Sequence, residues 1–298
     1  MPRPTHVLAW LCLPLAAAGC ADTTIALGDR DPPRWRFGEP EIVAELSAPA
    51  QTDNPSLTAD LREIYFTSQR SGGAAEIWTA TRANASARFS APRLVSELNS
   101  PLIETSPVIS ADGLTLWFGS ERAVGLGDLD IWVATRASRE ADWSAPQNVV
   151  ALNSASKDIP RPPGQHGEIM PLGSDRAVRG YYAIYFAARS GAAQPFGSPE
   201  PVAELSTPSV SMVDAFLTDD GTALLYVEGP AFGPADLYIT QRKSADEPFG
   251  EPVALADLNT RYDERDPFLS ADGSQLYFSS NRSGQYEIYV ASVRIEAP

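Results

Sequence analysis

One pattern recurs five times along this 298-residue chain, and it constrains the fold more than any other feature. Every copy has two apolar runs joined by a short turn, usually Asp-Gly, followed by a third run that starts with an aliphatic and an aromatic residue. The turns contain Asp60, Asp112, His166, Asp220 and Asp272, and the third runs begin at Ile77, Ile131, Ile184, Leu237 and Ile288. The third runs are 54, 53, 53 and 51 residues apart, which is typical of a repeat architecture.

A fourth short segment completes four of the copies. It starts at an aromatic residue twelve positions after the aliphatic one and ends at a leucine nine positions later; the aromatic residues are Phe89, Trp143, Phe196 and Phe249. The last copy lacks this segment, but Phe37 to Leu46 has the same aromatic-to-leucine spacing. Four strand-like segments per repeat predict an all-β, five-bladed β-propeller with four-stranded antiparallel blades. We expect residues 37–46 to pair with the last blade and close the ring.

The repeat resembles that of a known family. Its cleanest copy spans residues 264–282, with Asp266-Pro267 before the Asp272-Gly273 turn, and residues 54–70 and 106–122 match it closely. This pattern is similar to the repeat of TolB-type propellers, in which the Asp-Gly turn links the two inner strands. The resemblance implies a propeller fold. It implies no single function, because such propellers occur as scaffolds, binding proteins and enzyme domains.

The direction of the strands assigns two faces to the ring. The innermost strand of each blade begins at one face, here called the entry face, where the loops between the second and third strands also lie. The Asp-Gly turns lie at the other face, here called the turn face. Loop length varies at the entry face, being longest after Ser120 and shortest after Ser280. We therefore predict that the entry face is the binding surface.

Acidic and basic residues recur at the entry face. Acids near the start of the innermost strands are expected to approach the axis, and arginines begin the adjoining loops. The candidate binding residues are Asp53, Glu104, Asp158, Asp214, Glu264, Asp266, Arg70, Arg122, Arg176 and Arg282. One interpretation is structural, with each arginine pairing with a carboxylate of its own or the next blade. The other is that unpaired carboxylates among Glu104, Asp158 and Glu264 bind a polyol or a hard cation such as Ca²⁺ at the channel mouth.

Paired carboxylates also allow an enzymatic hypothesis. Glycosidases use one carboxyl group as acid and another as base or nucleophile, and Arg265-Asp266-Pro267 resembles a short signature of some propeller-fold sugar hydrolases. Asp-Pro also belongs to the repeat itself, so we assign no catalytic residues. His166 replaces aspartate in a turn and is the only histidine after residue 19, which argues against a clustered-histidine metal site and against a catalytic triad.

The third copy of the repeat is irregular. Residues 158–166 contain four prolines or glycines where the other copies have an apolar strand. Proline donates no hydrogen bond to a sheet, so this strand is predicted to pair poorly. Either the blade has lost its regularity without effect, or this segment forms a specialised rim together with residues 179–182 on the opposite loop.

The first residues predict export. Arg3 is followed by an apolar run over residues 7–18, which is too short to span a bilayer. The end of this run belongs to Ala17-Ala18-Gly19-Cys20, which resembles the lipobox of bacterial lipoproteins. We expect a signal peptide over residues 1–19 and a lipidated cysteine at the new N-terminus. Cleavage by a general signal peptidase is the alternative, because Ala17 stands where the lipobox usually has leucine.

Domain boundaries and function follow from these observations. A linker is expected over residues 20–34 and the propeller over residues 35–298, and the net charge of −15 argues against nucleic acid as a partner. We predict a monomeric, non-enzymatic binding or scaffolding lipoprotein without a cofactor, periplasmic or anchored to the outer membrane. Its expected partner is an envelope protein or polymer, and it meets the membrane only through its lipid. The alternative is a carbohydrate-active enzyme that uses carboxylates at the mouth of the central channel.

Overall fold

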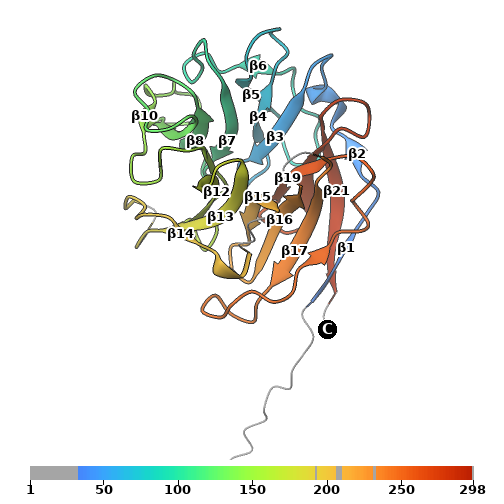
Figure 1. Cartoon of the computed structure of the whole chain (residues 1–298). Coiled ribbons are helices and arrows are strands. Elements are labelled where there is room, and N and C mark those ends of the chain that lie inside the picture. The colour runs from blue at the N-terminus through green and yellow to red at the C-terminus, as the bar shows by residue number, and fades with distance from the viewer. Residues whose placement is uncertain (1–32, 192, 206–209, 231–232, 297–298) are drawn as a thin grey trace, which may run out of the picture. The chain divides into compact units, whose positions relative to one another are not determined.

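Short antiparallel strands arranged as five sheets around one axis make up nearly all of the regular structure in this computed structural model (Figure 1). The structure describes residues 33–191, 193–205, 210–230 and 233–296. Two short 3-10 helices, Ala44–Leu46 and Ala203–Leu205, are also present in these ranges. No helix among the described residues has the length and apolar character needed to cross a membrane. The chain is therefore a five-bladed β-propeller, as the repeat predicts.

Each blade uses four strands in chain order from the axis outward, except where the ring closes. Blade one contains β3 (Thr52–Leu57), β4 (Glu63–Ser68), β5 (Glu76–Thr81) and β6 (Arg93–Leu94). Blade two contains β7 (Glu104–Ile109), β8 (Thr115–Ser120), β9 (Asp130–Thr135) and β10 (Gln147–Asn148). Blade three contains β11 (Asp158–Pro160), β12 (Ile169–Val178), β13 (Tyr181–Ala188) and β14 (Glu200–Pro201). Blade four contains β15 (Ser211–Leu217), β16 (Ala223–Gly229), β17 (Asp236–Gln241) and β18 (Val253–Ala254). Blade five contains β19 (Glu264–Leu269), β20 (Gln275–Ser280), β21 (Glu287–Glu296), β1 (Arg34–Phe37) and β2 (Glu41–Ile42).

The hydrophobic core lies between neighbouring blades. Tyr65 and Ile77 of blade one pack with Phe118 and Trp132 of blade two in one buried cluster. The recurring aromatic residues of the second and third strands supply these contacts, so their periodicity reflects packing rather than a ligand site. Each blade is thereby held in place by the next one.

The N-terminal segment closes the ring beside the last blade. Glu41 and Ile42 of β2 pair with Val290 and Tyr289 of β21, which confirms the predicted closure by residues 37–46. The structure adds a second contact that the repeat did not indicate. Strand β1 pairs with the far end of β21, from Phe37 opposite Val293 to Arg34 opposite Glu296 (Figure 1). Regular structure therefore starts one residue before the expected boundary at residue 35.

Blade three departs from the others at its innermost strand. Strand β11 has three residues, whereas β3, β7 and β19 have six each. The prolines that follow Asp158 cannot extend the ladder, so the short pairing agrees with the expectation from the sequence. After β11 the chain keeps backbone contacts with β12, from Arg161 to Pro171 and from Gly164 to Ile169, and it supplies residues of the site described below.

Removal of residues 35–46 should leave an exposed edge on β21 and remove apolar side chains from two core clusters. We expect the truncated protein to melt more than about 10 °C below the parent or to aggregate, since each 1 kcal/mol lost costs a few degrees in a chain of this size. Calorimetry and size-exclusion chromatography measure both effects. Deletion of residues 21–31 serves as the control and should leave the melting temperature unchanged. A truncated protein that melts like the parent would contradict this closure.

Candidate functional site

The acids predicted to form an open site at the entry face are enclosed. The side chains of Glu104, Asp158 and Glu264 are fully buried. Each accepts hydrogen bonds from the backbone and side chain of a residue four positions earlier, as Glu104 does from Ser100. These carboxylates therefore anchor the beginnings of β7, β11 and β19 instead of facing a ligand.

The repeat arginines complete these anchors. The guanidinium groups of Arg122, Arg176 and Arg282 lie 3.1, 2.6 and 3.1 Å from the carboxylates of their own blades. Each also donates to a carbonyl oxygen at the end of an outer segment, as Arg122 does to Leu98 at 2.5 Å. This arrangement corresponds to the structural interpretation of the pattern.

Arg70 plays the same part in blade one without a carboxylate of its own blade. Thr52 occupies the position of the acid, and the Arg70 guanidinium donates to its hydroxyl at 3.3 Å and to the Leu46 carbonyl at 2.5 Å. Because Leu46 belongs to the closing segment, this arginine also fastens the N-terminal segment to blade one. Burial lowers the pKa of Arg70, and the Glu287 carboxylate partly opposes that change.

A ring of polar residues surrounds the axis, and every blade contributes to it. Four members lie at the β-bulge position of their inner strands with left-handed backbone angles: φ is 55° at Asn54, 50° at Ser106, 58° at Asp214 and 55° at Asp266. This conformation turns backbone and side-chain groups toward the neighbouring blade. The backbone N–H of Asn54 donates to the Asp266 carboxylate, and the Ser106 hydroxyl donates to the Asn54 side-chain oxygen at 2.9 Å.

Arg161 of blade three is the centre of this axial ring. Its guanidinium donates to the Asn54 side chain at 3.2 Å, to Asp266 at 3.3 Å and, as a close ion pair, to Asp214. Arg161 is 7% exposed, and its Nε has no hydrogen-bond partner among the described residues. The irregular third copy thus places one buried cation between two buried carboxylates, a role that its proline content alone did not indicate.

Asp53 lies next to the ring and is half-buried. Burial and the nearby Asp266 carboxylate raise the pKa of Asp53 to about 7, although the Asn54 amide and two arginines act in the opposite direction. The group is therefore partly protonated near neutral pH.

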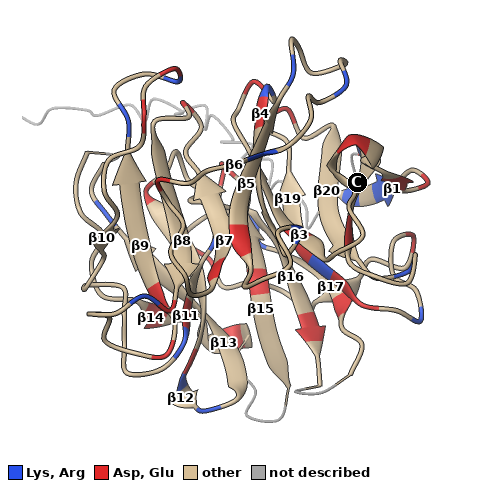
Figure 2. Cartoon of the chain, turned by 90° about the horizontal axis from the view of Figure 1, so that it is seen from above, with Lys and Arg blue, Asp and Glu red and all other residues tan. Residues whose placement is uncertain are grey.

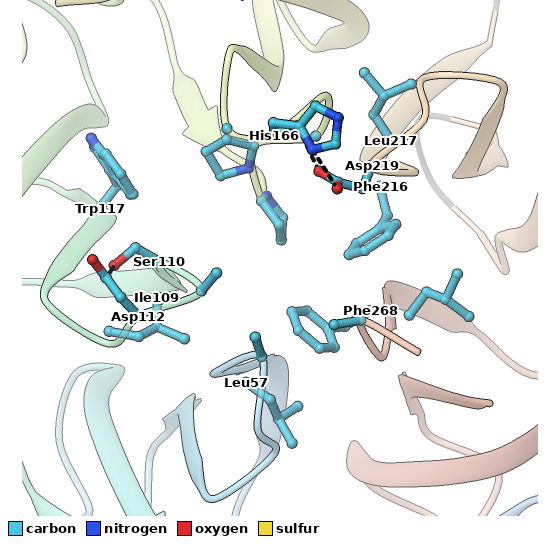
Figure 3. A pocket seen from close by; sticks show the side chains of 18 of the residues that line it. Leu57, Ile109, Ser110, Asp112, Trp117, His166, Phe216, Leu217, Asp219 and Phe268 are labelled. Carbon is cyan, nitrogen blue, oxygen red and sulfur yellow. Dashed lines mark hydrogen bonds and ion pairs between the residues drawn. The ribbon is translucent and has the colours of Figure 1, made fainter. Parts of the chain in front are cut away.

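A pocket opens at the turn face instead of the entry face. Its volume is about 470 Å³, and it is lined by residues that end the inner strands of several blades. Phe216 and Phe268 point into its centre and contact each other edge to face, with ring centroids 5.5 Å apart (Figure 3). Aliphatic walls surround them. These lining residues include Leu57, Ile109, Leu217 and Leu269, with Trp117 beside them.

Polar groups stand at the rim of this pocket. His166 Nδ1 lies 2.8 Å from an Asp219 carboxylate oxygen, and Figure 3 shows both at the edge of the cavity. Asp112 lies on another side of it. Burial acts to raise the pKa of Asp112, but hydrogen bonds from Ser110 and the Leu114 backbone outweigh it and lower that pKa. The rim thus holds carboxylates above an apolar floor.

The sequence contained one signal for this pocket. Phe216 and Phe268 each stand two positions after a ring aspartate on an innermost strand, where a side chain faces the channel. Loop-length variation instead predicts a binding surface at the entry face. Within the described ranges, no group of three or more His, Cys, Asp or Glu side chains is arranged to hold a metal ion, so no residues are assigned to the expected hard cation.

Solved structures with this fold have varied activities. The endo-arabinase of Bacteroides thetaiotaomicron has a TM-score of 0.60 at 13% identity, covering 88% of this chain and 98% of that one. The α-L-arabinofuranosidase of Lactobacillus brevis has a TM-score of 0.58 at 12% identity, with 85% and 94% covered. TolB from Acinetobacter baumannii has a TM-score of 0.51 at 15% identity, with 85% of this chain and 57% of that chain covered. These likenesses show a shared fold.

The chain therefore corresponds to a little over half the length of that TolB protein. No protein-family model matches the sequence, and no curated protein matches it. The resemblance of the repeat to TolB-type propellers is supported at the level of fold. Because both binding proteins and glycosidases share this architecture, the choice between them depends on the site itself.

Replacement of Arg161 should destabilise the propeller by leaving Asp214 and Asp266 buried without a counter-charge. We expect Arg161→Met to lower the free energy of unfolding by about 3 kcal/mol. Adding Asp214→Asn and Asp266→Asn to the same chain should recover most of this loss, because the uncompensated charges are then absent. Denaturant titration measures both.

The exposed Arg88, which pairs with Glu45 at the surface, provides the control for Arg161. Arg88→Met should change stability by less than about 0.5 kcal/mol. Equal effects of the two substitutions would contradict the role assigned to Arg161.

The raised pKa of Asp53 predicts a pH-dependent stability. The folded protein holds this proton up to about pH 7, whereas the unfolded chain releases it near its ordinary value of 3.8. The stabilisation contributed by protonated Asp53 is complete below pH 3.8 and is lost as the pH rises toward 7. Relative to Asp53→Asn, the parent should therefore lose more than about 1 kcal/mol between pH 4 and pH 8. Unfolding curves across this range measure it, with Asp142→Asn as the exposed control; parallel curves for parent and Asp53→Asn would refute the shift.

Proposed function

We propose that this chain is a non-enzymatic binding protein of the bacterial cell envelope and that its ligand enters the turn-face pocket. One observation carries the proposal. The cavity at the axis has an apolar floor made by Phe216 and Phe268, while the carboxylates beside it are committed to Arg161. Concave apolar sites with a few polar groups at the rim are typical of ligand binding.

The state of the acids favours binding over sugar hydrolysis. Glycoside hydrolysis needs two carboxyl groups that flank the scissile bond in an open cleft. Asp214 and Asp266 are buried and share the Arg161 guanidinium, and the three entry-face anchors are enclosed by hydrogen bonds. A sugar ring cannot reach these carboxylates without breaking buried ion pairs, which is costly.

Asp53 supports a second candidate function. A carboxyl group that keeps its proton near neutral pH has the property required of the general acid in a glycosidase, and Asp266 lies close enough to raise the Asp53 pKa. Arabinan-degrading enzymes are among the proteins that share the fold. On this alternative the substrate is a glycan bound at the entry face, with Asp53 as the acid.

We also propose that the protein is exported and lipid-anchored through Cys20, which lies outside the described residues, as does the predicted signal peptide over residues 1–19. The sequence of the first 20 residues supports this. Incorporation of labelled palmitate into the parent and not into Cys20→Ala tests it. Equal labelling of both chains would exclude this anchor.

Two measurements separate the candidate functions. N-phenyl-1-naphthylamine, a neutral apolar dye, should gain fluorescence with the parent. Ala111→Trp, which places a large side chain at an exposed position of the pocket lining, should weaken this response at least about tenfold. Ala85→Trp, at an exposed position outside the pocket lining, should bind the dye like the parent. Equal dye binding by all three chains would overturn the pocket assignment.

Hydrolysis is measured on the same proteins. Incubation with arabinan and with nitrophenyl glycosides should release no sugar above the buffer rate. Release that disappears in Asp53→Asn and persists in Ala111→Trp would replace the binding proposal with the enzymatic one.

A further inference from the structure

We propose that the occupant of the turn-face pocket is a basic peptide segment with one aromatic or large aliphatic side chain that enters the apolar well. This inference rests on the proposed function and names the class of its ligand. It combines the shape of the cavity, the composition of its floor and the charge around its mouth.

The floor and the volume point to a single large side chain. A cavity of about 470 Å³ lies within the size range of small-ligand pockets and is far too small for a folded domain. Phe216 and Phe268 line the cavity as an edge-to-face pair that an incoming ring can extend. The ion-paired side chains of Arg161, Asp214 and Asp266 are not among the residues that line the cavity. An apolar anchor therefore fits the well, and a charged one does not.

The mouth of the well is negative. Asp112 of blade two and Asp219 of blade four line it, and Asp220 and Asp272 line a second cavity that shares Phe216 and Asp219 with it. Hydrogen bonds within each turn outweigh burial and hold the pKa of Asp112 and Asp220 below the ordinary value. Carboxylates that keep their charge to low pH attract cations, and the net charge of −15 adds a long-range field of the same sign.

Basic residues as well as acidic ones lie on the loops of the propeller (Figure 2). Arg139 and Arg189 lie near this mouth, and each contacts a group other than the Asp112 carboxylate, although the Arg139 charge contributes to the lowered pKa of Asp112. Arg139 pairs with Asp60 at 2.6 Å. The Arg189 guanidinium lies over the Phe196 ring at 4.3 Å and donates to the Gly167 carbonyl. Asp112, Asp220 and Asp272 remain in hydrogen bonds with their own turns. Arginine or lysine residues of a ligand are the groups that complement these turns.

The distribution of the acids favours a peptide over a small amine. The turn carboxylates belong to different blades, so a ligand that meets several of them must extend across the mouth while its anchor occupies the centre. A short peptide with basic residues on both sides of one aromatic residue does both. Anionic lipids and nucleic acids carry the same charge sign as the rim and are repelled by it.

Fluorescence anisotropy with four labelled pentapeptides tests the proposal on the whole mature chain. The probes are Lys-Lys-Trp-Lys-Lys, Lys-Lys-Leu-Lys-Lys, Lys-Lys-Gly-Lys-Lys and Glu-Glu-Trp-Glu-Glu. We expect saturable binding of the first two with dissociation constants below about 1 mM and no saturation with the other two. Ala111→Trp should weaken the first by at least about tenfold, with Ala85→Trp as the steric control.

A charge variant isolates the rim. In Asp112→Asn the amide oxygen can still accept the turn hydrogen bonds from Ser110 and Leu114, so only the charge is lost. We expect about two- to fivefold weaker binding of Lys-Lys-Trp-Lys-Lys and a smaller dependence on salt, with the exposed Asp142→Asn unchanged. Thermal melting of each variant verifies folding.

Three outcomes would overturn the inference. They are equal binding of the glycine and tryptophan peptides, binding of the acidic peptide as tight as that of the basic one, and no binding of any peptide. If the neutral dye still occupies the pocket in the last case, the proposed binding function stands and only the basic peptide is excluded. If the dye also fails to bind, the pocket itself is refuted.

Discussion

A single cation at the axis is the interaction on which the rest of this propeller depends. Five blades converge there, and the left-handed bulges of Asn54, Asp214 and Asp266 turn polar groups inward. Without a counter-charge, two of these groups would be buried carboxylates facing each other across a narrow channel. Arg161 joins blades one, four and five to blade three through direct contacts. The irregular copy of the repeat thus supplies the cation that pairs with both buried carboxylates at the axis.

The arginine and carboxylate pairs that recur at the entry face are structural, whereas several residues with special roles depart from the repeat. The carboxylate and arginine pairs at the entry face occur in three blades with nearly the same geometry, where they anchor the beginnings of the inner strands β7, β11 and β19. Arg161, Asp53 and the Phe216–Phe268 pair occur once each. A residue type that recurs at the entry face does not mark one blade as special, so its recurrence at the blade period favours a packing role.

Much of the fold was accessible from the sequence, and much less of the site. Spacing alone predicts the strands and the closing role of residues 37–46, because a missing fourth strand must be supplied from elsewhere. It could not predict β1, since the extension of β21 to Glu296 has no counterpart in other blades. It could not decide whether Glu104 is open or paired, because both states use the same residues. That decision depends on a distance of about 3 Å across the blade, which no spacing records.

At the entry face, loop length has a structural reason in at least one blade. The long entry-face loop after Arg122 is held by the buried Asp130 carboxylate, which accepts a hydrogen bond from the backbone N–H of Gly127 at 3.1 Å. The extra residues of this loop therefore stabilise the loop itself. The loops at the turn face have constant lengths. Beneath them, two inner strands have phenylalanine near their ends, at Phe216 and Phe268. Strand β1 also reaches this face, where Trp35 lines a second cavity of about 360 Å³ that shares Phe216 with the first. The segment that closes the ring therefore also builds the surface on which the pocket opens.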